Sequence, residues 1–92
     1  MAEVRDNTAE HRFEIVVDGA VAGRVEYVEE GGKLVFTHTE IDEAYEGQGL
    51  AGHLARGALD AVRASGRPAA SRCEFISGWV EKHPDYADVI AA

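Results

Sequence analysis

A change of hydrophobic period at Leu50 constrains the fold of this chain more than any other feature. Between residues 13 and 41, apolar and polar residues alternate in three runs, as they do in strands that bury one face. From Leu50 to Ser65 the apolar residues recur at helical spacing, and Gly66 and Pro68 follow as stop signals. The sequence therefore predicts an antiparallel meander of three strands, followed by a glycine-rich turn and a helix.

The flanking segments are less regular. Residues 1–10 are polar and lack a period, so we predict no element there. Pro68 to Cys73 is predicted as a short strand, because the chain must return across the sheet after the first helix. Apolar residues between 75 and 80 predict a second helix, with Glu74 at its start and basic residues at its end. The expected fold class is α/β, of the α+β kind, with a small, mostly antiparallel sheet and two helices.

Composition limits the classes of partner. The 92 residues, of which 46% are hydrophobic, fit one domain that spans residues 1–92. A single cysteine excludes an internal disulfide, and no apolar run approaches the roughly 18 residues that cross a bilayer. We therefore expect a protein of a reducing cytoplasm without membrane association. The formal charge of −8 repels phosphate backbones, which argues against a nucleic-acid partner.

The densest chemical signal is the segment EAYEGQGLAGHL, residues 43–54, which holds three glycines in six residues. Glycines let backbone amides approach a ligand, and the unpaired amides at a helix start attract phosphate. A structural interpretation stays open beside this one. Gly47 and Gly49 can simply form a tight turn, and Gly52 can let the helix pack closely on the sheet.

The same three glycines also spell the dinucleotide motif G-x-G-x-x-G, with Glu74 at the distance of a ribose-binding acid. The antiparallel strands before the turn and the short chain after Glu74 argue against a two-half nucleotide fold. A P-loop is excluded because no Lys-Ser or Lys-Thr follows the glycines. A nucleotide-binding fragment therefore stays a minor hypothesis.

The segment THTEIDEAYEGQGLAGHL, residues 37–54, resembles the strand, loop and helix that bind coenzyme A in the GCN5-related N-acetyltransferases. The signature of that family is Gln/Arg-x-x-Gly-x-Gly/Ala. Gly49 and Ala51 match its last two fixed positions, and Glu46 stands in the first. The resemblance implies that acetyl-CoA or coenzyme A is bound here. The implied binding residues are Glu46, Gly47, Gln48, Gly49, Leu50, Ala51, Gly52 and His53.

Three motifs in a fixed order make the resemblance closer to a compact subgroup of that family. They are His38-Thr39-Glu40-Ile41, Cys73-Glu74-Phe75 and His83-Pro84-Asp85-Tyr86. The implied activity is acetyl-CoA-dependent N-acetyl transfer to an amine acceptor, either a small molecule or a peptide. The resemblance also favours functional roles for His38 and Cys73.

Acetyl transfer needs a base for the amine and a proton donor for the departing thiolate. A period of two from Lys33 to Ile41 places Leu34, Phe36, His38 and Glu40 on one face, so either His38 or Glu40 could accept the amine proton. Both could instead be structural, His38 as a hydrogen-bonded side chain and Glu40 as a solvated strand end.

Cys73 directly precedes the second helix, whose N-terminal partial charge favours a thiolate that could itself take the acetyl group. A lone cysteine is also commonly a small buried residue. Tyr86 could donate the final proton, or it could simply cover the core. His11 and His53 join no ligand-like cluster, so no metal site is predicted.

Two classes of function remain. N-acetyl transfer to an amine is the leading hypothesis. The alternative is a coenzyme A-binding or protein-interaction module without significant turnover, because Glu46 places a carboxylate near the expected pyrophosphate.

Overall fold

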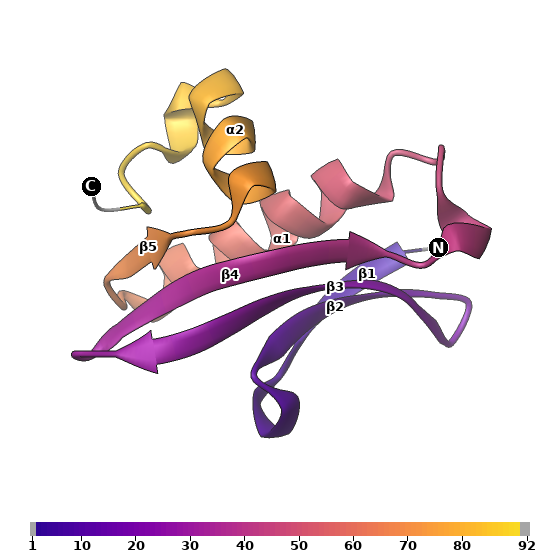
Figure 1. Cartoon of the computed structure of the whole chain (residues 1–92), viewed down its shortest axis with the longest axis horizontal. Helices are drawn as coiled ribbons and strands as arrows, with labels where there is room; N and C mark the ends of the chain where they lie inside the picture. Colours follow the sequence, from indigo (N-terminus) through magenta and orange to yellow (C-terminus); the bar gives the residue numbers. More distant parts are fainter. Residues whose placement is uncertain (1, 91–92) are drawn as a thin grey trace.

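The computed structural model describes residues 2–90 of the chain. Five strands form one sheet in the order β1-β2-β3-β4-β5, and both helices lie on the same face of it (Figure 1). Strands β1 to β4 are antiparallel neighbours, whereas β5 runs parallel to β4. These observations confirm the expected α+β class. The elements are β1 (Ala2–Asn7), η1 (Thr8–Glu10), β2 (Arg12–Val17), β3 (Ala20–Glu30), β4 (Lys33–Ile41), η2 (Glu43–Tyr45), α1 (Leu50–Ser65), β5 (Ala69–Ser71), α2 (Glu74–Lys82) and η3 (Pro84–Tyr86), where η denotes a 3-10 helix.

Both predicted helices are confirmed. Helix α1 begins at Leu50, and Gly66 ends it as a C-cap in the left-handed conformation, with φ of 72°. Helix α2 begins at Glu74 and carries Lys82 in its last turn, as the helix dipole favours. The short strand expected after Pro68 is present as β5. Within residues 2–90, no helix is long and apolar enough to span a membrane.

The prediction of no element in residues 1–10 is wrong, because Ala2–Asn7 form β1 beside β2. Val4 packs against α1 at Gly57, where an added Cβ would lie 2.6 Å from the Val4 side chain. Asp6 accepts a hydrogen bond of 2.7 Å from the Tyr27 hydroxyl. Long-range contacts therefore hold a strand whose only apolar residues are Ala2 and Val4, too few to reveal it in the sequence pattern.

The hydrophobic core lies between the sheet and the two helices. Aromatic and branched side chains of β2, β3 and β4 meet the apolar stripe of α1 and the buried face of α2. This packing holds the N-terminal end of α1 beside the last residues of β4 (Figure 1). Its largest members include Phe13, Ile15, Val25, Tyr27, Leu34, Phe36, Leu54, Leu59, Ile76 and Trp79.

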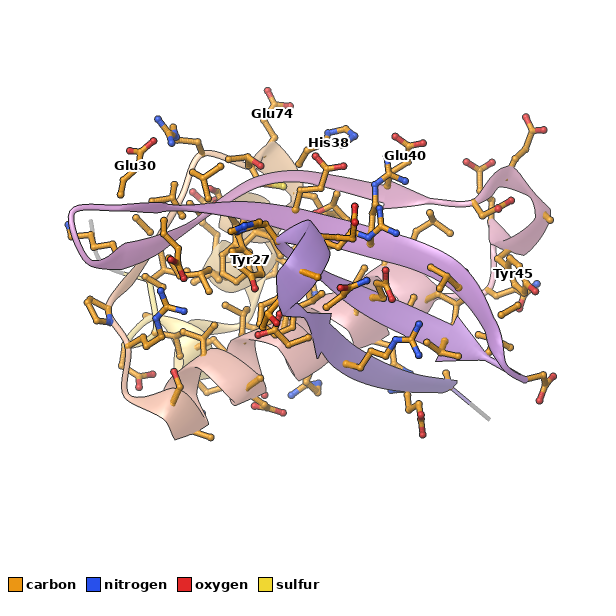
Figure 2. All side chains as sticks on the ribbon, turned by 90° about the horizontal axis from the view of Figure 1, so that it is seen from below. Tyr27, Glu30, His38, Glu40, Tyr45 and Glu74 are labelled. Atoms are coloured by element: carbon orange, nitrogen blue, oxygen red, sulfur yellow. The ribbon has the colours of Figure 1, made fainter. Side chains whose placement is uncertain are left out.

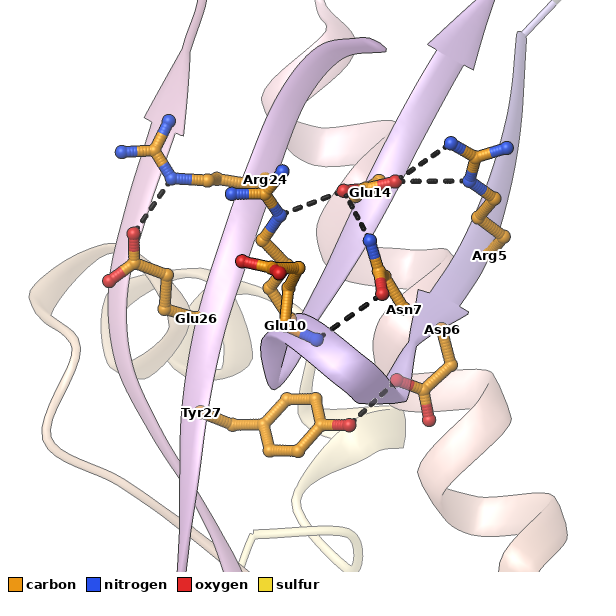
Figure 3. A network of polar contacts seen from close by, with 9 residues as sticks. Arg5, Asp6, Asn7, Glu10, Glu14, Arg24, Glu26 and Tyr27 are labelled. Carbon is orange, nitrogen blue, oxygen red and sulfur yellow. Dashed lines mark hydrogen bonds and ion pairs between the residues drawn. The ribbon is translucent and has the colours of Figure 1, made fainter.

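The face of the sheet that is turned away from the helices carries charged side chains. Glu14, whose neighbours along β2 point into the core, has 1% of its side chain exposed. It accepts hydrogen bonds of 3.0 Å from Arg5 and Asn7 (Figure 3). It also accepts one of 2.7 Å from Arg12. Burial alone would raise the pKa of Glu14, but these hydrogen bonds outweigh burial and the pKa lies below its ordinary value.

Glu14 belongs to a line of cross-strand neighbours of alternating sign, which we call the charged row. Its members are Arg5, Glu14, Arg24 and Glu40, one from each of the first four strands. Arg24 also forms an ion pair of 2.7 Å with Glu26 on its own strand. Opposite charges on adjacent strands attract one another, so this face satisfies its own charges.

Candidate functional site

The glycine-rich turn joins β4 to α1 by way of η2. The Asp42 carboxylate caps η2 by accepting a hydrogen bond of 3.0 Å from the Ala44 amide. Gly47 and Gly49 have φ angles of 83° and 74°, in the left-handed region that favours glycine. The backbone of the turn therefore requires both glycines.

Gly49 is the N-cap of α1, and no side chain of residues 2–90 caps this end of the helix. The first amides of an α-helix have no partner within the helix and carry partial positive charge. The start of α1 thus presents uncapped backbone donors, as a phosphate site requires.

A hollow of about 310 Å³, the turn hollow, lies between the glycine-rich turn, the end of β4 and the start of α2. Its lining includes five of the residues predicted to hold coenzyme A. Gln48 is exposed in the turn, whereas Gly52 and His53 line a different hollow, between α1 and α2. The residues lining the turn hollow are Thr39, Ile41, Tyr45, Glu46, Gly47, Gly49, Leu50, Ala51 and Phe75.

The structural interpretation of Gly52 is not supported. A Cβ added there would meet only the Trp79 indole nitrogen, at an ordinary 3.6 Å, and would not touch the sheet. The residue that lets α1 approach the sheet closely is Gly57, opposite Val4.

The alternation of β4 shifts at Thr37. Glu26 of β3 pairs with His38, and the next residue, Tyr27, pairs with Phe36, which leaves Thr37 as an extra residue. A bulge of this kind moves the following side chains to the opposite faces. Thr39 and Ile41 consequently lie on the helix side of the sheet, where they line the turn hollow.

The prediction that His38 and Glu40 share a face with Leu34 and Phe36 is therefore wrong. Both side chains are exposed and lie together on the side of β4 that is turned away from α1, with His38 Nε2 3.1 Å from Glu40 Oε1 (Figure 2). The hydrogen bond from His38, and secondarily the charge of Arg24, hold the pKa of Glu40 below its usual range. Glu40 therefore interacts with His38 and with Arg24, its neighbour in the charged row.

The second half of β4 has an open edge. Strand β5 pairs with β4 as far as Phe36. Beyond the bulge, the Asp42 amide donates to the Ala22 carbonyl at 2.8 Å, so the peptide groups of even-numbered residues face β3. Those of Thr39 and Ile41 face the other way, toward the side where β5 has ended.

Cys73 lies where the chain passes from β5 into α2. It is the N-cap of α2 and only 4% exposed, and its Sγ atom lies 3.2 Å from Thr39 Oγ1. It borders a hollow of about 380 Å³, the cysteine hollow, lined by Thr37, His38, Thr39, Arg72, Cys73, Glu74 and Phe75. The turn hollow and the cysteine hollow share Thr39 and Phe75. The structure thus brings Cys73 and His38 to one hollow, next to the glycine-rich turn.

The Tyr86 side chain is bound to helix α1. Its hydroxyl donates to Asp60 at 2.7 Å and accepts from Arg56 at 3.1 Å, and both partners are on α1. The hydrogen bond to Asp60, together with burial, raises the pKa of Tyr86. Its ring makes an edge contact with Trp79. Within residues 2–90, these contacts anchor the C-terminal segment to α1 and do not connect Tyr86 with Cys73.

The sequence prediction missed three residues at the centre of the site, namely Thr39, Ile41 and Phe75. Thr39 and Ile41 stand inside the His-Thr motif, and Phe75 inside the Cys-x-Phe motif. Their membership of those motifs is the one signal that pointed to them, because the period of β4 assigns Thr39 to the wrong face.

Comparison with known sequences identifies relatives. Residues 12–89 match the sequence profile of the GCN5-related N-acetyl-transferase family. Protein NATD1 of Gallus gallus is 32% identical over 84 residues, which cover 89% of this chain and 76% of that protein. Protein NATD1 of Homo sapiens is 42% identical over 60 residues, 64% of this chain and 51% of that protein.

Comparison with solved structures supports the same fold. A GCN5-like putative N-acetyltransferase from Staphylococcus aureus has a TM-score of 0.71 at 21% identity, covering 98% of this chain and 88% of the other. A ribosomal-protein-alanine N-acetyltransferase from Brucella melitensis has a TM-score of 0.53 at 17% identity, covering 88% of this chain and 63% of the other. With the sequence match over residues 12–89, we conclude that this chain belongs to the GCN5-related N-acetyltransferase family.

Proposed function

We propose that the protein transfers an acetyl group from acetyl-CoA to an amine acceptor. The observation that carries this proposal is the succession of two hollows that share Thr39 and Phe75, one beside the uncapped start of α1 and the other beside Cys73. A phosphate site and a thiol at opposite ends of one path suit a ligand with a pyrophosphate at one end and a thioester at the other.

The residues present fit coenzyme A in two respects. The uncapped amides at the start of α1 can hold the pyrophosphate, with Gly47 and Gly49 keeping side chains away from it. The peptide groups of Thr39 and Ile41 at the open edge of β4 can pair with the amides of the pantetheine arm, as an added strand would. Glu46 opposes the first of these interactions through its negative charge.

Acetyl transfer forms a C–N bond to the amine and breaks the C–S bond of the thioester, and the departing sulfur takes up a proton. Thr39 and Cys73 stand where the thioester would lie, with the Thr39 hydroxyl able to donate to Cys73 Sγ. In a two-step route, Sγ accepts the acetyl group and the amine then removes it. In a direct route, the amine attacks the thioester itself.

His38 is the candidate acceptor for the amine proton in either route. It lines the cysteine hollow, and its contact with Glu40 fixes the orientation of the imidazole. A base oriented by a second side chain is the arrangement that general-base catalysis favours. We do not propose Glu40 as the base, because its carboxylate is already paired with Arg24 and His38. Nor do we propose Tyr86 as the proton donor, since Arg56 and Asp60 engage its hydroxyl.

Two measurements test the proposal. Isothermal titration with coenzyme A should detect binding, and the absence of heat at millimolar ligand would contradict the proposed function. Intact-mass measurement after incubation with acetyl-CoA tests the two-step route. One acetyl adduct that is lost in Cys73→Ala supports that route, whereas an adduct that persists in this variant removes Cys73 from the mechanism.

One observation favours a second function, a coenzyme A-binding module without turnover. Glu46 lines the turn hollow, and its negative charge weakens rather than strengthens the binding of a pyrophosphate there. An acceptor screen across amines, peptides and polyamines separates the two functions. Acetylated product with one acceptor class supports the transferase, and slow hydrolysis of acetyl-CoA without acceptor preference supports the binding module.

A further inference from the structure

Arg56 differs from the other arginines of this chain. Six of the seven arginines form ion pairs with carboxylates. Arg5, Arg12 and Arg24 do so on the outer face of the sheet. The partners of Arg63, Arg67 and Arg72 are Asp88, Glu29 and Glu30. Within residues 2–90, Arg56 is the one arginine without such a pair. Its guanidinium donates to the Tyr86 hydroxyl and lies over the ring of Trp79, 5.3 Å from the centroid. In a protein with a formal charge of −8, an unpaired arginine is a candidate anion site.

Arg56 lines a third hollow, of about 450 Å³, which we call the arginine hollow. The other lining residues are Gly49, Gly52, His53, Trp79 and His83. Among residues 2–90, no acidic residue lines it, and Arg56 is its one permanently charged side chain. The Nδ1–H of His83 donates to the Trp79 carbonyl oxygen at 2.7 Å, because a carbonyl can only accept, and this fixes the imidazole in place.

The glycine at position 52 keeps this hollow open. Its φ is not positive, and a Cβ there would make only an ordinary contact with Trp79, so neither backbone nor packing requires glycine. Glycine inside a helix costs about 0.5–1 kcal/mol relative to alanine. A side chain at this position would project toward Trp79, into the space beside Arg56.

Gly49 lines both the turn hollow and the arginine hollow. The three hollows therefore follow one another, from Arg56 past the start of α1 to Cys73. Arg56 lies seven residues beyond Gly49, about 10 Å along the helix axis. In coenzyme A the 3′-phosphate stands one ribose away from the pyrophosphate, on the side opposite the pantetheine arm. With the pyrophosphate at the start of α1 and the thioester near Cys73, this phosphate falls on the arginine-hollow side.

We infer that the arginine hollow binds the 3′-phosphate of coenzyme A through Arg56, so that this protein discriminates coenzyme A from 3′-dephospho-coenzyme A. The inference rests on the proposed function. His53 and His83 line the same hollow, with their imidazole rings beside the space that Arg56 borders. A charge-assisted hydrogen bond from a guanidinium to a phosphate is stronger than one between neutral groups.

Isothermal titration with coenzyme A and with 3′-dephospho-coenzyme A tests the inference. We expect the wild-type protein to bind coenzyme A about tenfold more tightly. In Arg56→Gln this preference should disappear, and the affinity for the dephosphorylated ligand should stay the same. Arg63→Gln is the matched control, because Arg63 lies on the same helix and also contacts the Tyr86 ring but pairs with Asp88. This variant should keep the preference, and thermal unfolding should report a folded protein in both cases.

The outcomes distinguish failure of the inference from failure of the proposed function. Equal affinity of the wild-type protein for both ligands, or a preference that survives Arg56→Gln, overturns the inference and leaves the proposed function standing. Failure of the wild-type protein to bind either ligand contradicts the proposed function, and the inference with it.

Discussion

The two sides of β4 illustrate opposite uses of polar groups. On the outer side, His38 and Glu40 contact each other, and Glu40 also reaches Arg24 in the charged row. On the helix side, Thr39 and Ile41 border hollows, and their peptide groups face an edge that β5 does not cover. Apart from His38, which also borders the cysteine hollow, the outer side satisfies its polar groups internally. Polar groups available to a ligand lie on the helix side, at the strand edge and at the start of α1.

Changes to the glycine-rich turn should have the largest effect on ligand binding. Gly49→Ala forces a side chain into a φ of 74°, at the N-cap that positions the uncapped amides. We expect the affinity for coenzyme A, measured by isothermal titration, to fall about 50-fold.

Gly66→Ala is the control for that experiment. Gly66 has nearly the same φ, 72°, at the other end of α1. In the described part of the chain, an added Cβ has no neighbour within 4 Å at either glycine. The two variants should lose similar stability, while Gly66→Ala binds coenzyme A normally. Equal losses of affinity would show that the turn acts through helix stability alone.

On the outer face, the largest effect should be on stability rather than on binding. Glu14→Gln removes a buried charge that three side chains hydrogen-bond, and we expect the free energy of unfolding to fall by about 2 kcal/mol at pH 7. Chemical denaturation measures this change, and coenzyme A affinity should remain as in the wild type.

The contribution of Glu14 to the free energy of unfolding should also depend on pH. Because the pKa of Glu14 is lower in the folded state, its contribution is present above the ordinary carboxyl pKa of about 4.5 and is lost as pH falls through the folded value. The stability difference between the wild type and Glu14→Gln should therefore shrink below that pH. A difference that stays constant down to pH 3 would contradict the assigned charge.

A smaller effect is expected from Glu46 in the turn hollow. Replacement by glutamine removes negative charge near the expected pyrophosphate and keeps the size of the side chain. Affinity for coenzyme A should rise about threefold at low ionic strength, and the gain should diminish with added salt. Weaker binding by Glu46→Gln would indicate that the carboxylate contacts the ligand favourably.

The smallest effect is expected from Glu40 on stability. Its contacts with His38 and Arg24 are exposed, and exposed ion pairs contribute little. Glu40→Gln should shift the thermal unfolding midpoint by less than about 3 °C and leave coenzyme A binding unchanged. The acetylation rate is measured in the same variant. A loss of rate without a loss of binding would identify Glu40 as a positioning residue that orients His38.

The sequence predicts elements whose signal is local. The period from Leu50 to Ser65 defines α1, and the left-handed conformations of Gly47 and Gly49 are those that glycine uniquely favours. Strand β1 is not predicted, because residues far away in the sequence stabilise it. One of them is Tyr27, whose hydroxyl donates to Asp6.

The site is predicted less completely than the fold for a similar reason. The extra residue Thr37 moves the later side chains of β4 to the opposite faces of the sheet. Simple alternation from Phe36 onward cannot reveal this shift. The motif containing Thr39 identified the right segment, whereas the assignment of individual side chains needed the pairing of β3 with β4.

A titration of the protein with coenzyme A, followed residue by residue through backbone amide chemical shifts, tests the central claim most directly. We expect the largest shifts at the start of α1, at Thr39 and Ile41, and around Cys73, with the amides of Arg5, Glu14 and Arg24 in the charged row almost unmoved. Shifts concentrated on the charged row, or none at millimolar coenzyme A, would contradict this claim.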